Sequence, residues 1–342
     1  MKILKYLGCA IIIFLSFLCP ALVHAKKVYI TPGLWGQLFA IDNPLFNRDG
    51  GLDVLYQLRE TARESGYELL QADSLDSLDE FEYLVVFDVF LDQLQILSQY
   101  PKEKLILFLW EPPSVLPENF NLENHRCFSK VYTWCDNLVD NEKYFKFYYP
   151  VMKPMISEPV DFYMKNLSTL IACNKESFYP GELYSERRNL IYFFETVNAN
   201  DFILFGKWWP SSLKNYAGPI EKKVDCLKFF RFCYAYENIR NIPGYITEKI
   251  FDCFQAGTVP IYWGAHNIGS YIPKDCFISR QDFSDDAALY TFLKNMDEVS
   301  YNQYVCNIQQ FLSSPQAALY SKEHFITLFM NLITNPSSKE KP

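Results

Sequence analysis

Several short motifs that would reveal the chemistry of an unknown chain are missing from this sequence. It contains no C-x-x-C pair, which excludes the usual ligand spacing of a structural zinc site. It has neither G-x-G-x-x-G nor a P-loop, so the standard dinucleotide and nucleoside triphosphate fingerprints are absent. Its four histidines are scattered and form no obvious ligand cluster. No metal site is predicted.

An excess of positive charge is also missing. The chain has 32 Lys and Arg against 40 Asp and Glu, a net charge of −8, whereas a nucleic-acid-binding protein needs a basic surface. No nucleic-acid partner is therefore expected, although a local basic cluster can still hold a small anionic ligand. The 342 residues are 49% hydrophobic and 17% aromatic, which is enough apolar material for two packed domains.

The N-terminus has the pattern of a secretory signal. Lys2 and Lys5 precede an apolar run at 6–19, and a small-residue cleavage site ends at Ala25. An uncleaved membrane anchor is the alternative, but the apolar run is short for spanning a bilayer. We predict that residues 1–25 are a signal peptide or an N-terminal anchor, with possible membrane association through this segment.

Short apolar runs alternate with a helical pattern in the first half of the chain. They are dense in Val, Ile, Leu and aromatic residues, as expected of strands buried on both faces. The runs are KKVYIT (26–31), EYLVVFDVF (82–90), KLILFLW (104–110) and KVYTW (130–134). Residues 51–65 have helical spacing between the first two. This alternation predicts an α/β fold with a largely parallel sheet.

A second cycle of the same kind follows. The expected strands are 168–175, 201–209, 229–238 and 258–264. The expected helices are 185–197, capped by Ser185, and 247–257, in which Cys253 is expected to lie in the core.

The two cycles predict two Rossmann-like domains that face a cleft, with a ligand at the carboxyl ends of the strands. The predicted divisions are a first domain at 26–150, a proline-containing linker at 151–167, a second domain at 168–334 and a tail at 335–342.

Lys249 is out of place in an otherwise regular helix start. Thr247 is a good helix cap, yet Lys249 stands in the first turn, where the helix dipole disfavours a cation. A strand, a loop and a helix N-terminus in this order suit a phosphate-bearing ligand, beside which the ammonium becomes favourable. The alternative is that Lys249 points to solvent or pairs with Glu248 or Asp252.

The stretch 234–283 holds many fixed positions in a recognisable order. They are Tyr236-Glu237-Asn238, Tyr245-Ile246-Thr247-Glu248-Lys249, Ala256-Gly257, Val259-Pro260-Ile261, Gly264, Phe277-Ile278 and Asp282-Phe283. This pattern resembles the donor-binding signature of family 10 glycosyltransferases, the α1,3/4-fucosyltransferases. The resemblance implies a GT-B fold, a GDP-fucose donor and inversion at the anomeric carbon of fucose.

The resemblance also implies roles for single residues of the second domain. Lys249 would contact the diphosphate, Glu248 the donor sugar or ribose, and Tyr245 would line the nucleotide pocket, which Asn238 would support. The alternatives are that Tyr245 is a packed loop aromatic, Asn238 a turn residue and Glu237 a plain surface acid.

An arginine at the start of the helix 185–197 is the next candidate. SERRNLIYFFE resembles a family helix start whose arginine reaches the donor phosphates. We assign that role to Arg188, because Asn189 follows it, with Arg187 as the fallback. The alternative is a solvated charge beside Glu186.

An inverting transfer needs a base that takes the proton from the acceptor hydroxyl. The family places a glutamate for this task after a strand of the N-terminal half, and Glu111 at the end of LILFLWEPP fits that place. Its position between Trp110 and two prolines would hold it rigidly and raise its pKa by desolvation. Glu118 and Glu123 are the rival bases.

The sequence contains no D-x-D, the carboxylate motif with which metal-dependent glycosyltransferases of the other major fold hold their ion. Lys249, Arg188 and the helix N-terminus would instead neutralise the leaving GDP, so no metal or other cofactor is expected.

The sequence therefore predicts an inverting fucosyltransferase. The N-terminal domain would hold a glycan acceptor, most simply the 3-OH of N-acetylglucosamine or glucose, and the C-terminal domain would hold GDP-fucose. Two alternatives are a GT-B transferase with another nucleotide sugar and a non-catalytic glycan-binding protein on that scaffold. A Golgi lumen supplied with imported donor, or a bacterial envelope protein facing inward, would reconcile the cytosolic donor with an export-directed N-terminus.

Overall fold

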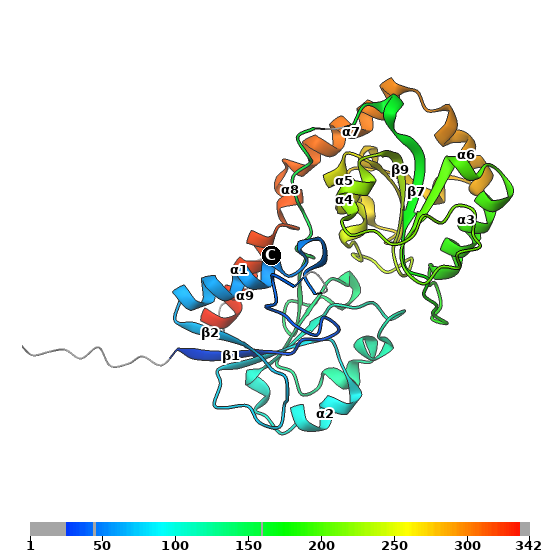
Figure 1. Cartoon of the computed structure of the whole chain (residues 1–342). Coiled ribbons are helices and arrows are strands. Elements are labelled where there is room, and N and C mark those ends of the chain that lie inside the picture. Colours follow the sequence, from blue (N-terminus) through cyan, green and yellow to red (C-terminus); the bar gives the residue numbers. More distant parts are fainter. Residues whose placement is uncertain (1–24, 44–45, 159, 336–342) are drawn as a thin grey trace, which may run out of the picture.

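The computed structural model describes residues 25–43, 46–158 and 160–335. Figure 1 shows two α/β domains, the first in the lower part of the view and the second in the upper part. The predicted signal or anchor, apart from Ala25, lies outside the described residues, and so does the predicted tail after Asn335.

The N-terminal domain is built on one parallel sheet. Its strands follow the order β2-β1-β3-β4-β5-β6 in the described residues. Their bounds are β1 Lys26–Ile30, β2 Tyr67–Gln71, β3 Tyr83–Phe87, β4 Leu105–Leu109, β5 Lys130–Thr133 and β6 Tyr144–Lys146. The helices are α1 Asp53–Glu64 and α2 Leu91–Leu97. The four expected strands and the expected helix are confirmed, whereas β2 and β6 are additional.

The C-terminal domain repeats this plan. Its parallel strands follow the order β11-β10-β9-β7-β8. Their bounds are β7 Asn166–Ile171, β8 Phe202–Phe205, β9 Phe230–Tyr236, β10 Val259–Trp263 and β11 Ile278–Ser279. The helices are α3 Tyr184–Thr196, α4 Lys223–Leu227, α5 Glu248–Ala256, α6 Asp286–Asn295 and α7 Glu298–Leu312. Two Rossmann-like domains, as predicted, are thus confirmed.

The strand order places a topological switch point in each sheet. The chain leaves β7 to form β8 on one side and then crosses back to form β9 on the other side of β7. The connections that leave the carboxyl ends of β7 and β9 therefore run in opposite directions, and ligands of open α/β sheets bind in the crevice between such connections. This position is where α3 and α5 begin.

The C-terminal helix crosses back to the first domain. After α7 and α8 (Pro315–Ala318), the helix α9 (Lys322–Thr334) lies beside α1 in the lower half of Figure 1. Phe325 and Phe329 of α9 pack against Phe108 of β4 within the core of the first sheet. Residues that the sequence placed in the second domain thus complete the core of the first.

Phe329→Ala is expected to destabilise the N-terminal domain by about 3–5 kcal/mol, because it empties a fully buried site. Thermal unfolding of the full-length chain measures the effect, with Thr327→Ala on the exposed face of α9 as the matched control. A loss no larger than that of the control would show that α9 is not part of this core.

Polar contacts and a close backbone approach join the two domains. Lys146 of β6 lies 2.5 Å from Asp136, which also accepts a hydrogen bond from Asn267 of the second domain at 2.8 Å. At Gly244 a Cβ atom would come within 2.4 Å of the carbonyl oxygen of Trp134 and the φ angle is +81°. Glycine therefore permits both this close approach and this backbone conformation.

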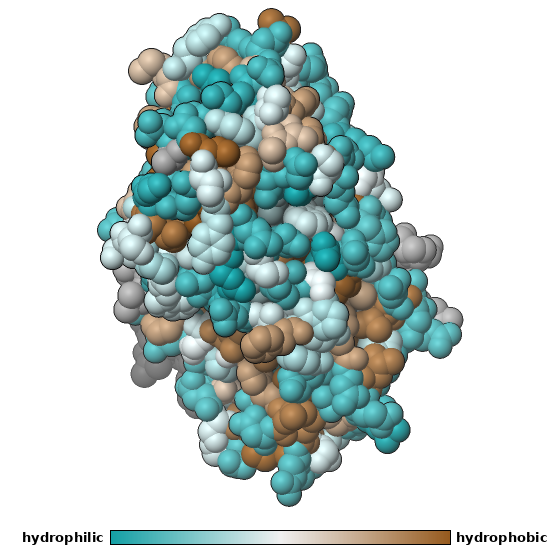
Figure 2. Space-filling view, turned by 90° about the vertical axis from the view of Figure 1, so that its right-hand side faces the viewer, coloured by the Kyte–Doolittle hydropathy of each residue, from teal (hydrophilic) through white to brown (hydrophobic). Residues whose placement is uncertain are grey.

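None of the helices in the described part of the chain is both long and apolar enough to cross a bilayer. On the face shown in Figure 2, hydrophilic residues predominate and apolar residues occur in separate small groups.

Candidate active site

A pocket opens at the switch point between β7 and β9. Lys175 follows β7, Arg187 lies on α3, Lys223 on α4, and Lys249 on α5, so four cationic side chains line it. Glu248 and Asp252 of α5 are among the other lining residues. The predicted binding position, at the carboxyl ends of the strands, coincides with this pocket.

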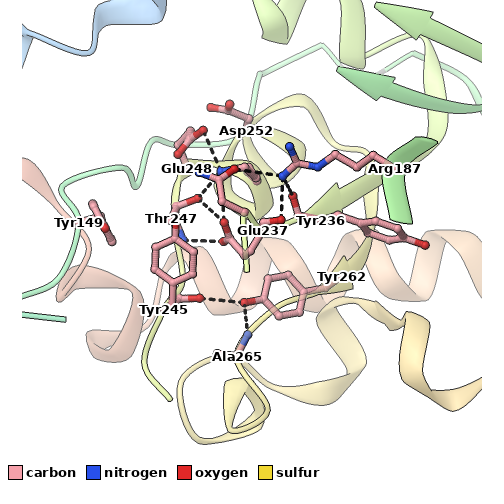
Figure 3. Close-up of polar contacts among 12 residues, drawn as sticks. Tyr149, Arg187, Tyr236, Glu237, Tyr245, Thr247, Glu248, Asp252, Tyr262 and Ala265 are labelled. Atoms are coloured by element: carbon pink, nitrogen blue, oxygen red, sulfur yellow. Dashed lines mark hydrogen bonds and ion pairs between the residues drawn. The ribbon is translucent and has the colours of Figure 1, made fainter. Parts of the chain in front are cut away.

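Lys249 is paired with a fully buried carboxylate. Its Nζ lies 3.2 Å from Oε2 of Glu237, a side chain with no exposed surface at the end of β9. The backbone N–H and the hydroxyl of Thr247 both donate to Glu237, each at 2.8 Å (Figure 3). The Glu237 carboxylate therefore explains how an ammonium is tolerated in the first turn of α5.

The sequence does not reveal this pair, and the interpretation of Glu237 as a plain surface acid is wrong, because its side chain is fully buried. Thr247 does stand at the cap position, but its hydroxyl donates to Glu237 and accepts a hydrogen bond from the Lys249 ammonium at 3.1 Å rather than from a backbone N–H of the helix. Burial lowers the pKa of Lys249, but the carboxylates of Glu237 and Glu248 raise it by more. The net pKa is raised, so the ammonium stays charged. Burial raises the pKa of Glu237, and Lys249 opposes that shift.

A second ion pair lies one helical turn further along α5. Lys223 Nζ is 2.7 Å from Asp252 Oδ2 and 3.7 Å from Glu248 Oε1. Burial raises the pKa of Glu248, but Lys249 and Lys223 lower it more, so the pKa falls and Glu248 is ionised. By contrast, the ammonium of Lys175 has no hydrogen bond or ion pair within the described part of the chain.

Arg187, the fallback of the sequence analysis, is the arginine that lines the pocket. It is 4% exposed, and its Nη2 donates to the carbonyls of Tyr236 and Glu237, both at 2.7 Å, and to Asn238 Oδ1 at 3.1 Å (Figure 3). Its Nε is buried without a partner in the described residues. Arg188 is not among the residues that line the pocket, and it donates to the carbonyl of Lys175 at 2.9 Å.

The register of α3 explains why Arg187, and not Arg188, lines the pocket. Tyr184, Arg187, Ile191 and Phe194 are buried, at the three- and four-residue spacing of one helix face. Ser185 is not the cap, because Glu182 accepts hydrogen bonds from the backbone N–H groups of Tyr184 and Ser185. The apolar spacing of the helix was a signal that could have selected Arg187.

Asn238 lies in the pocket, whereas Tyr245 lies outside it. Asn238 lines the pocket, where its side chain accepts the hydrogen bond from Arg187. Tyr245 is 2% exposed and packs on Trp134 of the first domain, with ring centroids 4.5 Å apart. It lies at the domain interface and is not among the residues that line this pocket, as expected of a packed loop aromatic.

Glu111 lies near the pocket, on the other domain. It follows β4, and Lys249 and Lys175, both of which line the pocket, act electrostatically on its carboxyl group. Burial and the neighbouring Asp88 raise the pKa of Glu111 to about 7, although the two lysines oppose the shift. A carboxylate with this pKa is suited to accept a proton near neutral pH.

The two rival bases have other surroundings. Glu123 is exposed and pairs with Arg126 at 2.5 Å. The carbonyl of Glu118 accepts a hydrogen bond from Asn124, and its side chain does not line the pocket. Of the three acids, Glu111 is the one whose carboxyl group interacts electrostatically with lysines that line the pocket.

The pH dependence of transfer should report the Glu111 carboxyl group. Below pH 7 this group is protonated and cannot accept a proton, so kcat/KM should rise about tenfold per pH unit and level off above the pKa of about 7. Initial rates between pH 5 and 9, with GDP affinity measured in parallel, test this. A flat profile over that range would contradict the assignment.

Comparison with known proteins agrees with this geometry. Residues 187–327 match the model of glycosyltransferase family 10 (fucosyltransferase), C-terminal part. This stretch belongs to glycosyltransferase family 10. The predicted family is thus confirmed, and the match begins at Arg187 and includes the whole of α5.

One curated relative is the α-(1,3)-fucosyltransferase FucT of Helicobacter pylori, 29% identical over 115 residues, which are 33% of this chain and 21% of that protein. The curated relatives are matched over only about a fifth of their own length.

Solved structures extend the likeness to both domains. The crystal structure of an α1,3-fucosyltransferase with GDP has a TM-score of 0.56 at 13% identity and covers 93% of each chain. An α-glucosyltransferase in complex with UDP and DNA has a TM-score of 0.56 at 11% identity, with 91% of this chain and 100% of that chain covered. These likenesses confirm the GT-B fold.

Within the described residues there is no group of three or more His, Cys, Asp or Glu side chains placed to hold a metal ion. The cations that line the pocket are side chains of the chain itself.

Proposed function

We propose that this chain transfers L-fucose from GDP-fucose to a hydroxyl group of a glycan acceptor, with inversion at the anomeric carbon. The observation that carries the proposal is the pairing of a cationic pocket, at the N-terminus of α5, with the Glu111 carboxyl group across the domain interface. Family membership of residues 187–327 supports the choice of fucose.

The pocket suits a nucleoside diphosphate. Lys249 lies at the helix N-terminus, where the unpaired N–H groups and the dipole favour an anion. Arg187 has a buried Nε without a partner in the described residues, and Lys175 brings an ammonium that forms no ion pair within that part of the chain. We assign the diphosphate to these three side chains and the ribose or the sugar to Glu248.

The reaction then proceeds as a single displacement. Glu111 takes the proton of the acceptor hydroxyl as its oxygen forms a bond to the anomeric carbon of β-L-fucose. The bond from this carbon to the phosphate oxygen breaks, and GDP leaves with the electron pair. The negative charge that grows on GDP meets Lys249, Arg187 and Lys175, and the product is α-linked.

The acceptor is bound in this proposal by the N-terminal domain, which supplies Glu111. We propose the 3-OH of an N-acetylglucosamine or glucose unit, since an α-(1,3)-fucosyltransferase is among the relatives. We further propose that no metal or other cofactor is required and that residues 1–25 direct the chain to a secretory compartment or a cell envelope.

A donor panel tests the proposal. The purified full-length chain is incubated with GDP-fucose, GDP-mannose, UDP-galactose or UDP-N-acetylglucosamine, with and without N-acetyllactosamine, and release of the nucleoside diphosphate is followed. Release from GDP-fucose that increases with acceptor is expected. Release from another donor would overturn the fucose assignment, and GDP binding by calorimetry without turnover of any donor would overturn the enzymatic one.

A further inference from the structure

Asp88 occupies an unusual position beside the Glu111 turn. It follows β3 directly, is 2% exposed, and has a φ angle of +65°. A residue with a side chain seldom adopts this left-handed conformation, and Asp is one of the few that tolerate it. A buried acid held in this conformation beside the candidate base is expected to serve the function of the site.

One oxygen of Asp88 holds the turn that carries Glu111. Oδ1 accepts hydrogen bonds from the backbone N–H of Trp110 at 2.6 Å and from that of Glu111 at 2.9 Å. It also accepts one from Nδ2 of Asn119 at 2.7 Å. Three donors on one carboxylate oxygen fix the backbone on which the Glu111 side chain stands.

Asn119 closes the same network from a third segment. Its Nδ2 donates to the carbonyl of Glu111 at 2.9 Å, and its Oδ1 accepts from the N–H of Val89 at 2.7 Å. Asn119 has no exposed surface, and its carbonyl lies 3.1 Å from the buried ring of His125. The ends of β3 and β4 are thus tied together on both sides of Glu111.

We propose that Asp88 is a positioning residue, which fixes the Glu111 turn by its hydrogen bonds and makes Glu111 a stronger base by its negative charge. This inference rests on the proposed function, in which Glu111 accepts the proton of the acceptor hydroxyl.

The charged surroundings of Glu111 agree with this role. Asp88 and Glu248 raise the pKa of Glu111, whereas Lys249 and Lys175 lower it. Burial raises the pKa of Asp88 itself to about 6, and its hydrogen bonds from Glu111, Asn119 and Trp110 oppose that shift. His125, whose pKa is lowered by burial to about 4, is neutral throughout the range in which Glu111 titrates.

Two variants separate the two parts of the role. Asp88→Asn keeps an oxygen that can accept the three hydrogen bonds but removes the charge. Its acid limb of kcat/KM should move to lower pH by about half to one unit, and kcat at pH 8 should fall severalfold because the base is weaker. Asp88→Ala removes both the hydrogen-bond acceptor and the negative charge. Its kcat should fall about 10–100-fold, with KM for GDP-fucose within about twofold of wild type.

Asp76→Asn, an exposed acid of the same domain, is the matched control and should match wild type in rate and pH profile. The inference is overturned if Asp88→Asn keeps the wild-type pH profile and kcat. It is also overturned if the Asp88→Ala variant, shown by calorimetry to be folded, loses GDP affinity in proportion to its rate.

A direct titration keeps this test independent of catalysis. The carboxyl carbon of Glu111 is followed by NMR in ¹³C-glutamate-labelled full-length protein and assigned with Glu111→Gln. A lower pKa of Glu111 in Asp88→Asn supports the coupling even if no fucose is transferred, in which case the proposed function alone has failed. An unchanged pKa of Glu111 contradicts the coupling.

Discussion

Replacing Glu111 by Gln is expected to lower kcat for fucosyl transfer by about 10²–10⁴-fold, while the affinity for GDP stays near that of the wild type. Gln has nearly the same shape but cannot accept the proton. Because Glu111 stands in the first domain and the pocket in the second, the loss should be confined to the chemical step. Initial rates and calorimetric titration with GDP measure the two quantities.

The same substitution should stabilise the fold. The pKa of Glu111 is raised to about 7, so the folded state binds this proton more tightly than the unfolded state. Its contribution to stability is therefore lost as pH rises from about 4.5 through about 7. At pH 8 Glu111→Gln should be more stable than wild type by up to about 3 kcal/mol, as judged by thermal unfolding.

Glu118→Gln is the matched control and should alter neither the rate nor the stability by much. An active Glu111→Gln variant would contradict the assignment of the base. Loss of activity together with loss of stability would show that Glu111 acts through the fold instead.

Removal of Lys249 is expected to have the second large effect, but a single substitution would be misleading. Lys249→Met leaves the fully buried carboxylate of Glu237 without its cation, which costs about 3–5 kcal/mol of stability. The informative variant is therefore the double substitution Glu237→Gln with Lys249→Met. The amide oxygen of Gln can still accept the hydrogen bond of the Thr247 backbone N–H, and its Nε2 can donate to the Thr247 hydroxyl oxygen.

The double variant should bind GDP about 10–100-fold more weakly, the equivalent of one charge-assisted hydrogen bond. It should also lose a further factor of about 10²–10³ in kcat, because the ammonium meets charge that grows on the leaving GDP. Glu237→Gln alone is the control and should retain GDP binding. Wild-type GDP affinity in a folded double variant would exclude Lys249 from the phosphate site.

The sequence predicted the fold where apolar runs were long and continuous. β1, β3, β4 and β5 were found in this way. The edge strand β6 was missed because it has only 3 residues, and β2 because polar Glu68 and Gln71 interrupt its apolar run. The return of α9 to the first domain was not visible either. Its apolar face fits a core of either domain, and only the path of the chain decides between them.

The sequence pointed to single residues of the candidate site but not to the ion pairs between them. Lys249 was recognised as an anomaly at a helix start, but its partner Glu237 lies beyond an intervening loop, and no local spacing marks such a pair. Arg188 was preferred to Arg187 because of the residue that follows it, although the buried spacing of α3 selects Arg187. Asp88 carried no signal in the sequence, since its role arises from two strand ends that meet.

The central claim is that Lys249, Arg187 and Lys175, with the N-terminus of α5, neutralise the leaving diphosphate. It is tested most directly by the rate of acceptor-dependent GDP release from GDP-fucose, measured in the wild-type chain after treatment with EDTA and again after Mn²⁺ or Mg²⁺ is returned. We predict that the rate in EDTA equals the rate with either ion. A rate that vanishes in EDTA and returns with the ion would contradict the account.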